Sequence, residues 1–312
     1  MRRRLYIPDE VKTSIREHLS GALSHAAEGY LSSHEDEDAI TGDLGGTLRS
    51  GVKRVYVVQS QTEIRGEWKW SITYSKFRGR GPRATESFVG ADGIFELDIQ
   101  SGSRRDQKSI LFQAKVAGAA DRGLLGQALK LTTWREAAFV LVYSETGYVA
   151  LSLDDVIADR GIIRDREGIP LAKYLGTSFL DCDVGDDELH YDSRRRRLIW
   201  RTMEGQVLAV SFSARHRIAF KIEAPRWGDG LPSIGREVRP DEIHNFRMQA
   251  TDDDVLSLRG HTSPRDVGKA RARLALIYHP DLVGELADEA YDRILTRRMQ
   301  EINAAVDRKR RK

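Results

Sequence analysis

Hydrophobic residues recur at helical spacing in the first fifty residues of the chain. Val11 and Ile15 begin an apolar stripe that predicts an amphipathic helix over residues 9–29. An acidic stretch then precedes Ile40 and Leu44, which are again spaced for one helical face. Acidic side chains are favoured in a first turn by the helix dipole, so this segment predicts a second helix.

Short runs rich in β-branched and aromatic residues follow and predict the strands of a sheet. These runs cover residues 53–59, 66–75, 93–99, 109–115, 138–144, 147–153 and several segments within 196–223. A helical pattern at 121–132 separates two of them. Strands interleaved with helices predict an α/β fold, with a central mixed sheet flanked by helices.

A change of pattern divides the chain near its C-terminal end. Proline and glycine are dense between residues 225 and 240, which indicates a linker over 225–250. Beyond it the pattern is helical to the end. We therefore expect an α/β domain with a β-rich extension over 1–224 and a small helical module over 251–312.

Composition narrows the class of protein. Apolar residues make up 40% of the 312 positions and charged residues 31%, which is typical of a folded globular chain. No stretch approaches the roughly 20 apolar residues that a membrane span needs. The single cysteine, Cys182, excludes an internal disulfide framework and favours a reducing compartment, so we expect a cytoplasmic protein without membrane contact.

Positive charge is clustered although the formal net charge is only +3. Arginine and lysine gather at residues 2–4, 76–83, 104–105, 194–197 and 309–312. Such clusters could follow the phosphate backbone of a nucleic acid, or they could be solvated loops and tails.

Chemistry-bearing side chains meet at one end of the hairpin predicted from strands 93–99 and 109–115. A polar loop over 101–107 separates the two strands, and its centre places Asp92 opposite Lys115 and Ile94 opposite Gln113. Side chains alternate along a strand, so Asp92, Gln113 and Lys115 share one face.

An acid, an amide and an ammonium are what metal-dependent phosphodiester cleavage requires. Asp92 is the natural ligand for Mg²⁺ or Mn²⁺, and Gln113 can offer a carbonyl oxygen. Lys115 can stabilise the transition state. Glu37, on the apolar face of the second helix, and Glu86, shortly before Asp92, are candidates for a further acid at the metal.

The order of these residues resembles the PD-(D/E)XK nuclease superfamily. The resemblance rests on Glu37, then Gly90-Ala-Asp92-Gly, then Gln113-Ala-Lys115, and covers roughly residues 30–155. Within the superfamily, the Q-x-K form resembles Mrr-like restriction endonucleases and antiphage effector nucleases. The resemblance implies a restriction-endonuclease-like fold, metal binding by Asp92 and Gln113, catalysis by Lys115, and a site completed by Glu37.

Two glutamines bear on this resemblance. Gln113 replaces the acid that is usual in the superfamily, while Gln127 falls on the predicted helix where related families often keep a glutamine. Two interpretations of the function therefore stay open. The resemblance implies a nuclease acting on DNA in prokaryotic defence, together with a defence-system partner protein. The alternative is a non-enzymatic adaptor that binds DNA or protein. A homo-oligomer is compatible with either reading.

The C-terminal module begins with a strong helix start. Ser263 is suited to the N-cap, Pro264 to the first helical position and Asp266 to the third. Val267 and Leu274 lie on an apolar stripe of this helix. A second helix follows to the chain end, so we expect an antiparallel helical pair.

The connection between these two helices resembles the J-domain of DnaJ-type co-chaperones. Its sequence is RLALIYHPD, with His279, Pro280 and Asp281 at the end of the first helix. The resemblance implies binding of a DnaK-type chaperone through this loop and through the basic residues Lys269, Arg271 and Arg273. The alternative is a helical pair that only packs on the α/β domain or on a partner.

Overall fold

The computed structural model describes most of the chain. The described residues are 7–33, 36–57, 66–77, 89–102, 104–118, 122–144, 146–163, 168–201, 206–212, 214–225, 236–237, 251–256, 258, 263–279 and 289–311.

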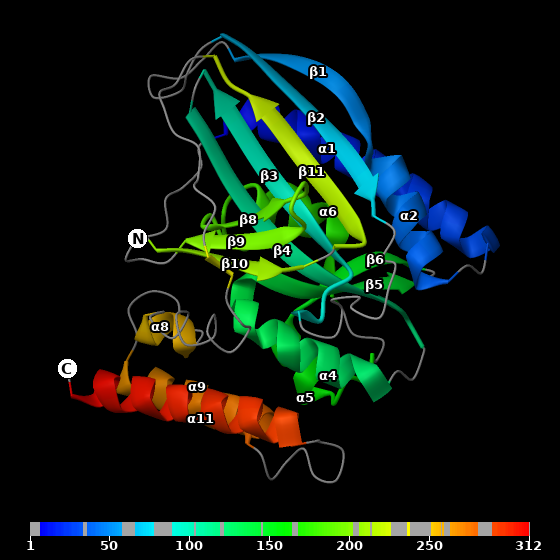
Figure 1. Cartoon of the computed structure of the whole chain (residues 1–312). Coiled ribbons are helices and arrows are strands. Elements are labelled where there is room, and N and C mark those ends of the chain that lie inside the picture. The colour runs from blue at the N-terminus through cyan, green and yellow to red at the C-terminus, as the bar shows by residue number, and fades with distance from the viewer. Residues whose placement is uncertain are drawn as a thin grey trace.

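A mixed sheet of eight strands forms the centre of the molecule, in the order β1-β2-β11-β3-β4-β5-β6-β7 (Figure 1). Its strands are β1 Ser50–Val57, β2 Gly66–Lys76, β3 Gly93–Ser101, β4 Arg104–Val116, β5 Ala138–Ser144, β6 Gly147–Leu151, β7 Ile169–Pro170 and β11 His216–Glu223. The β11–β3 and β4–β5 pairs are parallel, and the other pairs are antiparallel. The expected α/β fold with a mixed central sheet is therefore confirmed.

A second, four-stranded sheet packs beside the first in the order β12-β10-β9-β8. Its strands are β8 Leu189–Asp192, β9 Arg197–Arg201, β10 Val207–Ser211 and β12 Arg236–Glu237. The predicted linker over 225–250 lies outside the described residues except for Pro225 and β12, which pairs in parallel with β10.

Helices cover both faces of the large sheet (Figure 1). They are α1 Asp9–Ser33, α2 Glu37–Leu48, α4 Arg122–Leu131, the 3₁₀ helix η1 Thr132–Ala137, α5 Leu153–Ala158, α6 Leu171–Lys173, the π-helical η2 Tyr174–Phe179, α8 Asp252–Val255, α9 Pro264–Tyr278 and α11 Glu289–Arg310. The helices α1, α2 and α6 pack with η2 on one face. On the other face lie α4, α5 and η1, the small sheet and the C-terminal helices.

Strand alternation separates two hydrophobic clusters, one on each face. Along β5, Val140 and Val142 belong to the cluster under α4, whereas Phe139 and Leu141 belong to the cluster under α1. All four are buried, as are the paired Trp68 and Trp70 of β2, which pack under α1. A strand that is apolar on both sides must lie in the interior of a layered fold.

The β3–β4 hairpin corrects one sequence prediction. The expected polar loop over 101–107 is wrong, because both strands continue through most of it to a tight turn at Gly102. Arg105 donates to both carboxylate oxygens of Asp98 across the strands, at 2.8 and 2.6 Å. Opposite charges on neighbouring strands stabilise a ladder, so polar residues here belong to the strands.

The register of this hairpin therefore differs from the prediction by two residues. Ile94 pairs with Leu111 instead of Gln113, and the Asp92 amide donates to the Phe112 carbonyl at 2.9 Å, so Asp92 does not face Lys115. Because side chains alternate with a period of two, a shift of two leaves every side chain on its expected face.

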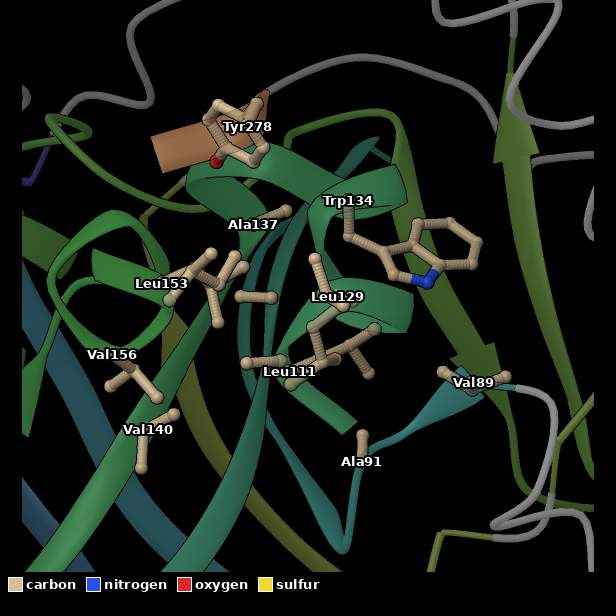
Figure 2. Packing of buried hydrophobic residues seen from close by; sticks show 14 of the residues in the cluster. Val89, Ala91, Leu111, Leu129, Trp134, Ala137, Val140, Leu153, Val156 and Tyr278 are labelled. Atoms are coloured by element: carbon tan, nitrogen blue, oxygen red, sulfur yellow. The ribbon is translucent and has the colours of Figure 1, made fainter. Parts of the chain in front are cut away.

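The helix α9 begins where the sequence predicts. Ser263 caps α9 in a capping box with Asp266, and Pro264 occupies the first position. The buried side of α9 joins the cluster under α4, and Figure 2 shows Tyr278 in the same cluster as Leu129 of α4 and Leu153 of α5. The Tyr278 hydroxyl donates to Asp154 of α5. The helical pair thus packs on the α/β part of the chain.

No helix in the described ranges is both long and apolar enough to cross a membrane.

A buried ion cluster attaches α11 to the segment after α4, and we expect Glu301→Gln to break it. Glu301 accepts from Arg298 at 2.9 Å and from Arg135 at 3.0 Å, and its side chain is 3% exposed. Removing its charge leaves two buried guanidinium groups without their shared carboxylate, which costs about 3–5 kcal/mol of unfolding free energy. Denaturation in urea measures the loss.

Arg308→Ala is the matched control, because it breaks the exposed pair with Asp252 on the same helix. Exposed pairs contribute about 0–1 kcal/mol. Equal effects of the two substitutions would contradict a special role for the buried cluster.

Candidate functional site

A bend before β3 carries Asp92. Gly90 adopts a left-handed conformation with φ of +75°, and a Cβ at this position would lie 2.7 Å from the Gln127 carbonyl oxygen of α4. Glycine therefore lets the bend lie directly against the backbone of α4. The Asp92 carbonyl in turn accepts from the amides of Arg215, at 2.9 Å, and His216, at 3.2 Å. These contacts fix the backbone of Asp92 between three segments of the chain.

The Asp92 carboxylate is held against β4. Its Oδ2 accepts from the Ala114 amide at 2.9 Å and from the side-chain amide of Gln113. Gln113 is 2% exposed, so this polar side chain is satisfied inside the fold. The aspartate and the glutamine predicted as metal ligands are thus direct neighbours.

Helix α2 places Glu37 beside Lys115 of β4. Asp36 caps the helix by accepting from the Ala39 amide at 2.8 Å, so Glu37 and Asp38 lie in the first turn. Gly45 leaves room for the ring of Tyr74, whose carbons lie 2.4 Å from where a Cβ would be. This close packing seats α2 on β2. The Glu37 carboxylate then accepts from Lys115 Nζ at 3.0 Å.

A polar network that the sequence did not predict lies beside this ion pair. Asp38 accepts from Lys76 Nζ at 2.6 Å and from His216 Nε2 at 2.8 Å, and the other ring nitrogen of His216 lies 2.9 Å from the Tyr74 hydroxyl. Partial burial raises the pKa of Asp38, but hydrogen bonds from Lys76 and His216 outweigh it, so its pKa is lowered. Burial lowers the pKa of His216, although the hydrogen bond to Asp38 and the negative charge of Asp38 act in the opposite direction.

These directions define the protonation states at neutral pH. Asp38 is ionised, and neutral His216 donates from Nε2 to it and accepts at Nδ1 from the Tyr74 hydroxyl. Burial, followed by the charge of Asp38, raises the pKa of Tyr74 to about 12, so its hydroxyl stays protonated. The network is therefore fully paired, and it holds the first turn of α2 against β2 and β11.

Side chains from all these elements surround one cavity. Its lining residues are Glu37, Asp38, Thr41, Asp92, Ala114, Arg215 and His216. Water-sized molecules have about 30 Å³ of space in this cavity, which is far less than the roughly 300–1,000 Å³ of pockets that enclose small ligands. A cavity of this size suits a small ion or a few water molecules.

The structure brings together Glu37, Asp92, Gln113 and Lys115. Glu86, Pro280 and Asp281 lie outside the described residues. His279 caps the end of α9, and the three predicted basic residues are exposed on that helix. These three are Lys269, Arg271 and Arg273.

The donor set at the cavity fits a hard divalent cation. No three His, Cys, Asp or Glu side chains in the described part of the chain form a ready-made metal cluster. Mg²⁺, however, is usually bound through only one or two carboxylates, with water and substrate phosphates as the other ligands. Asp92 and Glu37 supply two carboxylates at one cavity, and the side-chain amide of Gln113 donates to Asp92. The metal expected from the sequence is compatible with these residues.

Sequence reasoning missed the other three ionisable residues that line the cavity, Asp38, Arg215 and His216. Asp38 was part of a recognised acidic stretch, but nothing local distinguished it from its neighbours. His216 begins β11 and Arg215 directly precedes it; β11 inserts between β2 and β3 although it follows them by more than a hundred residues. Such a non-local insertion has no local signal in the sequence.

No protein family, curated protein or solved structure matches this chain.

The bend at Gly90 generates a prediction about stability. In Gly90→Ala the new Cβ meets the Gln127 carbonyl, and the left-handed conformation alone costs roughly 1–2 kcal/mol for a residue with a side chain. We expect at least that loss in the free energy of unfolding, measured by denaturation in urea. Gly21→Ala in α1, where nothing lies within 4 Å, should instead stabilise by about 0.5–1 kcal/mol. A neutral Gly90→Ala would show that the bend is not constrained by α4.

Proposed function

We propose that this chain is a metal-dependent nuclease that hydrolyses phosphodiester bonds of DNA. The observation that supports it most is the meeting of four side chains from α2, β4 and the bend before β3, beside one cavity that Glu37 and Asp92 line. Asp92 contacts Gln113, and Lys115 contacts Glu37 at 3.0 Å. A carboxylate pair beside a lysine is the inventory that this chemistry requires.

Each residue has a distinct role in this proposal. Asp92 and Gln113, with Glu37, would hold Mg²⁺ or Mn²⁺, which when bound polarises the scissile phosphate and lowers the pKa of bound water. Lys115 Nζ, fixed by Glu37, would stabilise the negative charge that develops on the phosphate oxygens. Arg215 lines the same cavity and would bind a neighbouring phosphate oxygen.

Membership of the PD-(D/E)XK superfamily, with its restriction-endonuclease-like fold, is part of the same proposal. The mixed sheet, the early helix whose acid meets the strand lysine, and α4 with Gln127 after that strand support it. A role in prokaryotic antiphage defence follows from the resemblance to effector nucleases alone.

Substitution of Lys115 tests the nuclease proposal. Lys115→Ala should lower the rate of plasmid nicking by about 10²–10³-fold, the usual cost of losing one group that stabilises the transition state. The assay uses supercoiled DNA with Mg²⁺ or Mn²⁺, and EDTA should stop it. Lys115→Met, which keeps the apolar stem of this buried side chain, should show the same loss with a melting temperature close to that of the wild type, because Glu37 is 35% exposed and water can replace the lysine as its partner.

Lys173→Ala, which removes an exposed lysine of α6, is the matched control and should cleave normally. Normal cleavage by Lys115→Met would refute the role of the lysine. Degradation of RNA in place of DNA would keep the site but correct the substrate.

A second candidate function concerns α9, and one observation favours it. Lys269, Arg271, Arg273 and His279 are exposed, while the opposite side of the same helix is packed in the core. This leaves the basic side accessible to a DnaK-type chaperone, as the resemblance to a J-domain implies. In this alternative the chain is a non-enzymatic adaptor that binds DNA or protein and recruits the chaperone through its C-terminal helices.

Stimulation of the ATPase of a DnaK-type chaperone tests this alternative. The purified chain should accelerate ATP hydrolysis, and His279→Gln should remove most of the acceleration because the exposed imidazole is then absent. Arg310→Ala, an exposed change on α11, should leave it intact. Equal stimulation by the His279→Gln variant would argue against a J-domain function.

A further inference from the structure

The walls of the cavity cannot by themselves attract a polyanion. Three carboxylates, Glu37, Asp38 and Asp92, line it beside one guanidinium, that of Arg215. Nucleic-acid binding depends on neutralising several phosphates along the backbone. If the cavity cleaves a nucleic acid, cationic groups near its entrance must hold the strand.

A turn rich in arginine meets this requirement. The last pair of the β8–β9 hairpin is Asp192 with Arg197, and residues 193–196 form the turn between them. We call this segment the arginine turn. Its three arginines, Arg194, Arg195 and Arg196, are all exposed.

The arginine turn has a defined shape. Asp192 Oδ1 accepts from the amides of Arg194, at 2.9 Å, and Arg195, at 3.0 Å. Arg196 adopts a left-handed conformation with φ of +52°, which closes the turn. A backbone fixed in this way presents guanidinium groups with less loss of entropy on binding than a mobile tail would.

Most of the positive charge of the turn is not compensated. Only Arg195 pairs with a carboxylate, that of Asp192 at 3.1 Å, and its side chain remains 55% exposed. Within the described ranges, Arg194 and Arg196 have no carboxylate partner. The guanidinium group can bind a phosphate through two parallel hydrogen bonds.

Two independent contacts connect the arginine turn to the cavity. The Phe212 amide donates to the Arg196 carbonyl at 3.0 Å, and Arg215 follows Phe212 by three residues. On the other side, the ring of Tyr191 packs on Phe77 with centroids 6.4 Å apart, and the Phe77 amide donates to the Arg215 carbonyl at 2.8 Å. The turn and the cavity-lining arginine are therefore built on one continuous piece of structure.

We propose that the arginine turn binds the phosphate backbone of duplex DNA and holds it beside the cavity. This inference rests on the nuclease function proposed above and names the surface that recognises its substrate. Contacts to phosphates position the duplex and carry no sequence information of their own. Arg194 and Arg196 supply the main contacts, and Arg215 continues the path into the cavity.

Binding without cleavage tests this inference separately from the nuclease function. The full chain in EDTA is titrated into a labelled DNA duplex, and the affinity is measured by fluorescence anisotropy from 50 to 200 mM salt. The triple variant Arg194→Ala, Arg195→Ala, Arg196→Ala loses up to three phosphate contacts. The slope of log affinity against log salt should then fall by about 2.7, since each contact contributes about 0.9.

A matched control removes the same charge elsewhere. Arg308→Ala, Arg310→Ala, Arg311→Ala takes three arginines from the end of α11 and the residue after it. In Figure 1 this end of the chain lies at the lower left, whereas α2, whose first turn lines the cavity, lies at the right. The control should bind DNA with the wild-type slope. A duplex bound equally well by both triple variants would overturn the inference, and so would a wild-type chain that binds no duplex or prefers an RNA hairpin.

Cleavage data then separate the two proposals. If the wild type nicks plasmid, the variant in the arginine turn should raise KM and leave kcat within about twofold. The reason is that contacts to the DNA backbone stabilise the bound substrate and the transition state equally. A fall in kcat with unchanged KM would contradict a binding role. If neither the wild type nor the variants cleave DNA, but the salt slope still falls in the variant of the arginine turn, the nuclease proposal is wrong and the DNA-binding surface is supported.

Discussion

The ion pair between Lys115 and Glu37 is the constraint on which the site depends. A lysine side chain that is only 7% exposed is costly to bury unless a carboxylate meets its ammonium group. Glu37 can do so only because the first turn of α2 is held at the end of β4. That position requires the close contact of Gly45 with Tyr74 and the pairing of Asp38 with Lys76 and His216. The packing of α2 and the geometry of the cavity are thus one and the same arrangement.

Local physics was sufficient to predict much of this structure from the sequence. The start of α9 follows from short-range side-chain chemistry at Ser263, which accepts from the amide three residues ahead. The hairpin that carries Gln113 was placed on the correct face although its register was wrong by two residues. Burial on both faces of the sheet determines which side each residue takes, whereas the turn determines the exact pairing. A pattern of apolar residues indicates the face of the sheet on which each side chain lies, but it does not indicate the pairing register.

The rest of the site depends on contacts that no local pattern contains. β11 pairs with β2 on one side and β3 on the other, so His216 and Arg215 reach the cavity only after the chain has formed β8, β9 and β10 of the small sheet. The same insertion supplies the amides that bind the Asp92 carbonyl. Asp92 itself was predictable from its neighbours in sequence, but the groups that fix its backbone were not. Sequence reasoning therefore found the residues proposed to hold the metal and to stabilise the transition state, but missed Arg215 and the residues that position the site.

The C-terminal helices show why the two proposed activities must be separated by single substitutions. Tyr278, Leu274 and Leu295 belong to the cluster that also contains Leu129 of α4, and α4 supports the bend at Gly90. Removing residues 251–312 would expose this cluster and withdraw the support behind Asp92. If a truncated chain failed to cleave DNA, the cause could be a damaged core or a lost chaperone contact, and the experiment would not distinguish them. Lys115 contacts Glu37 at the cavity and His279 is exposed at the surface, so each can be changed without disturbing that shared packing.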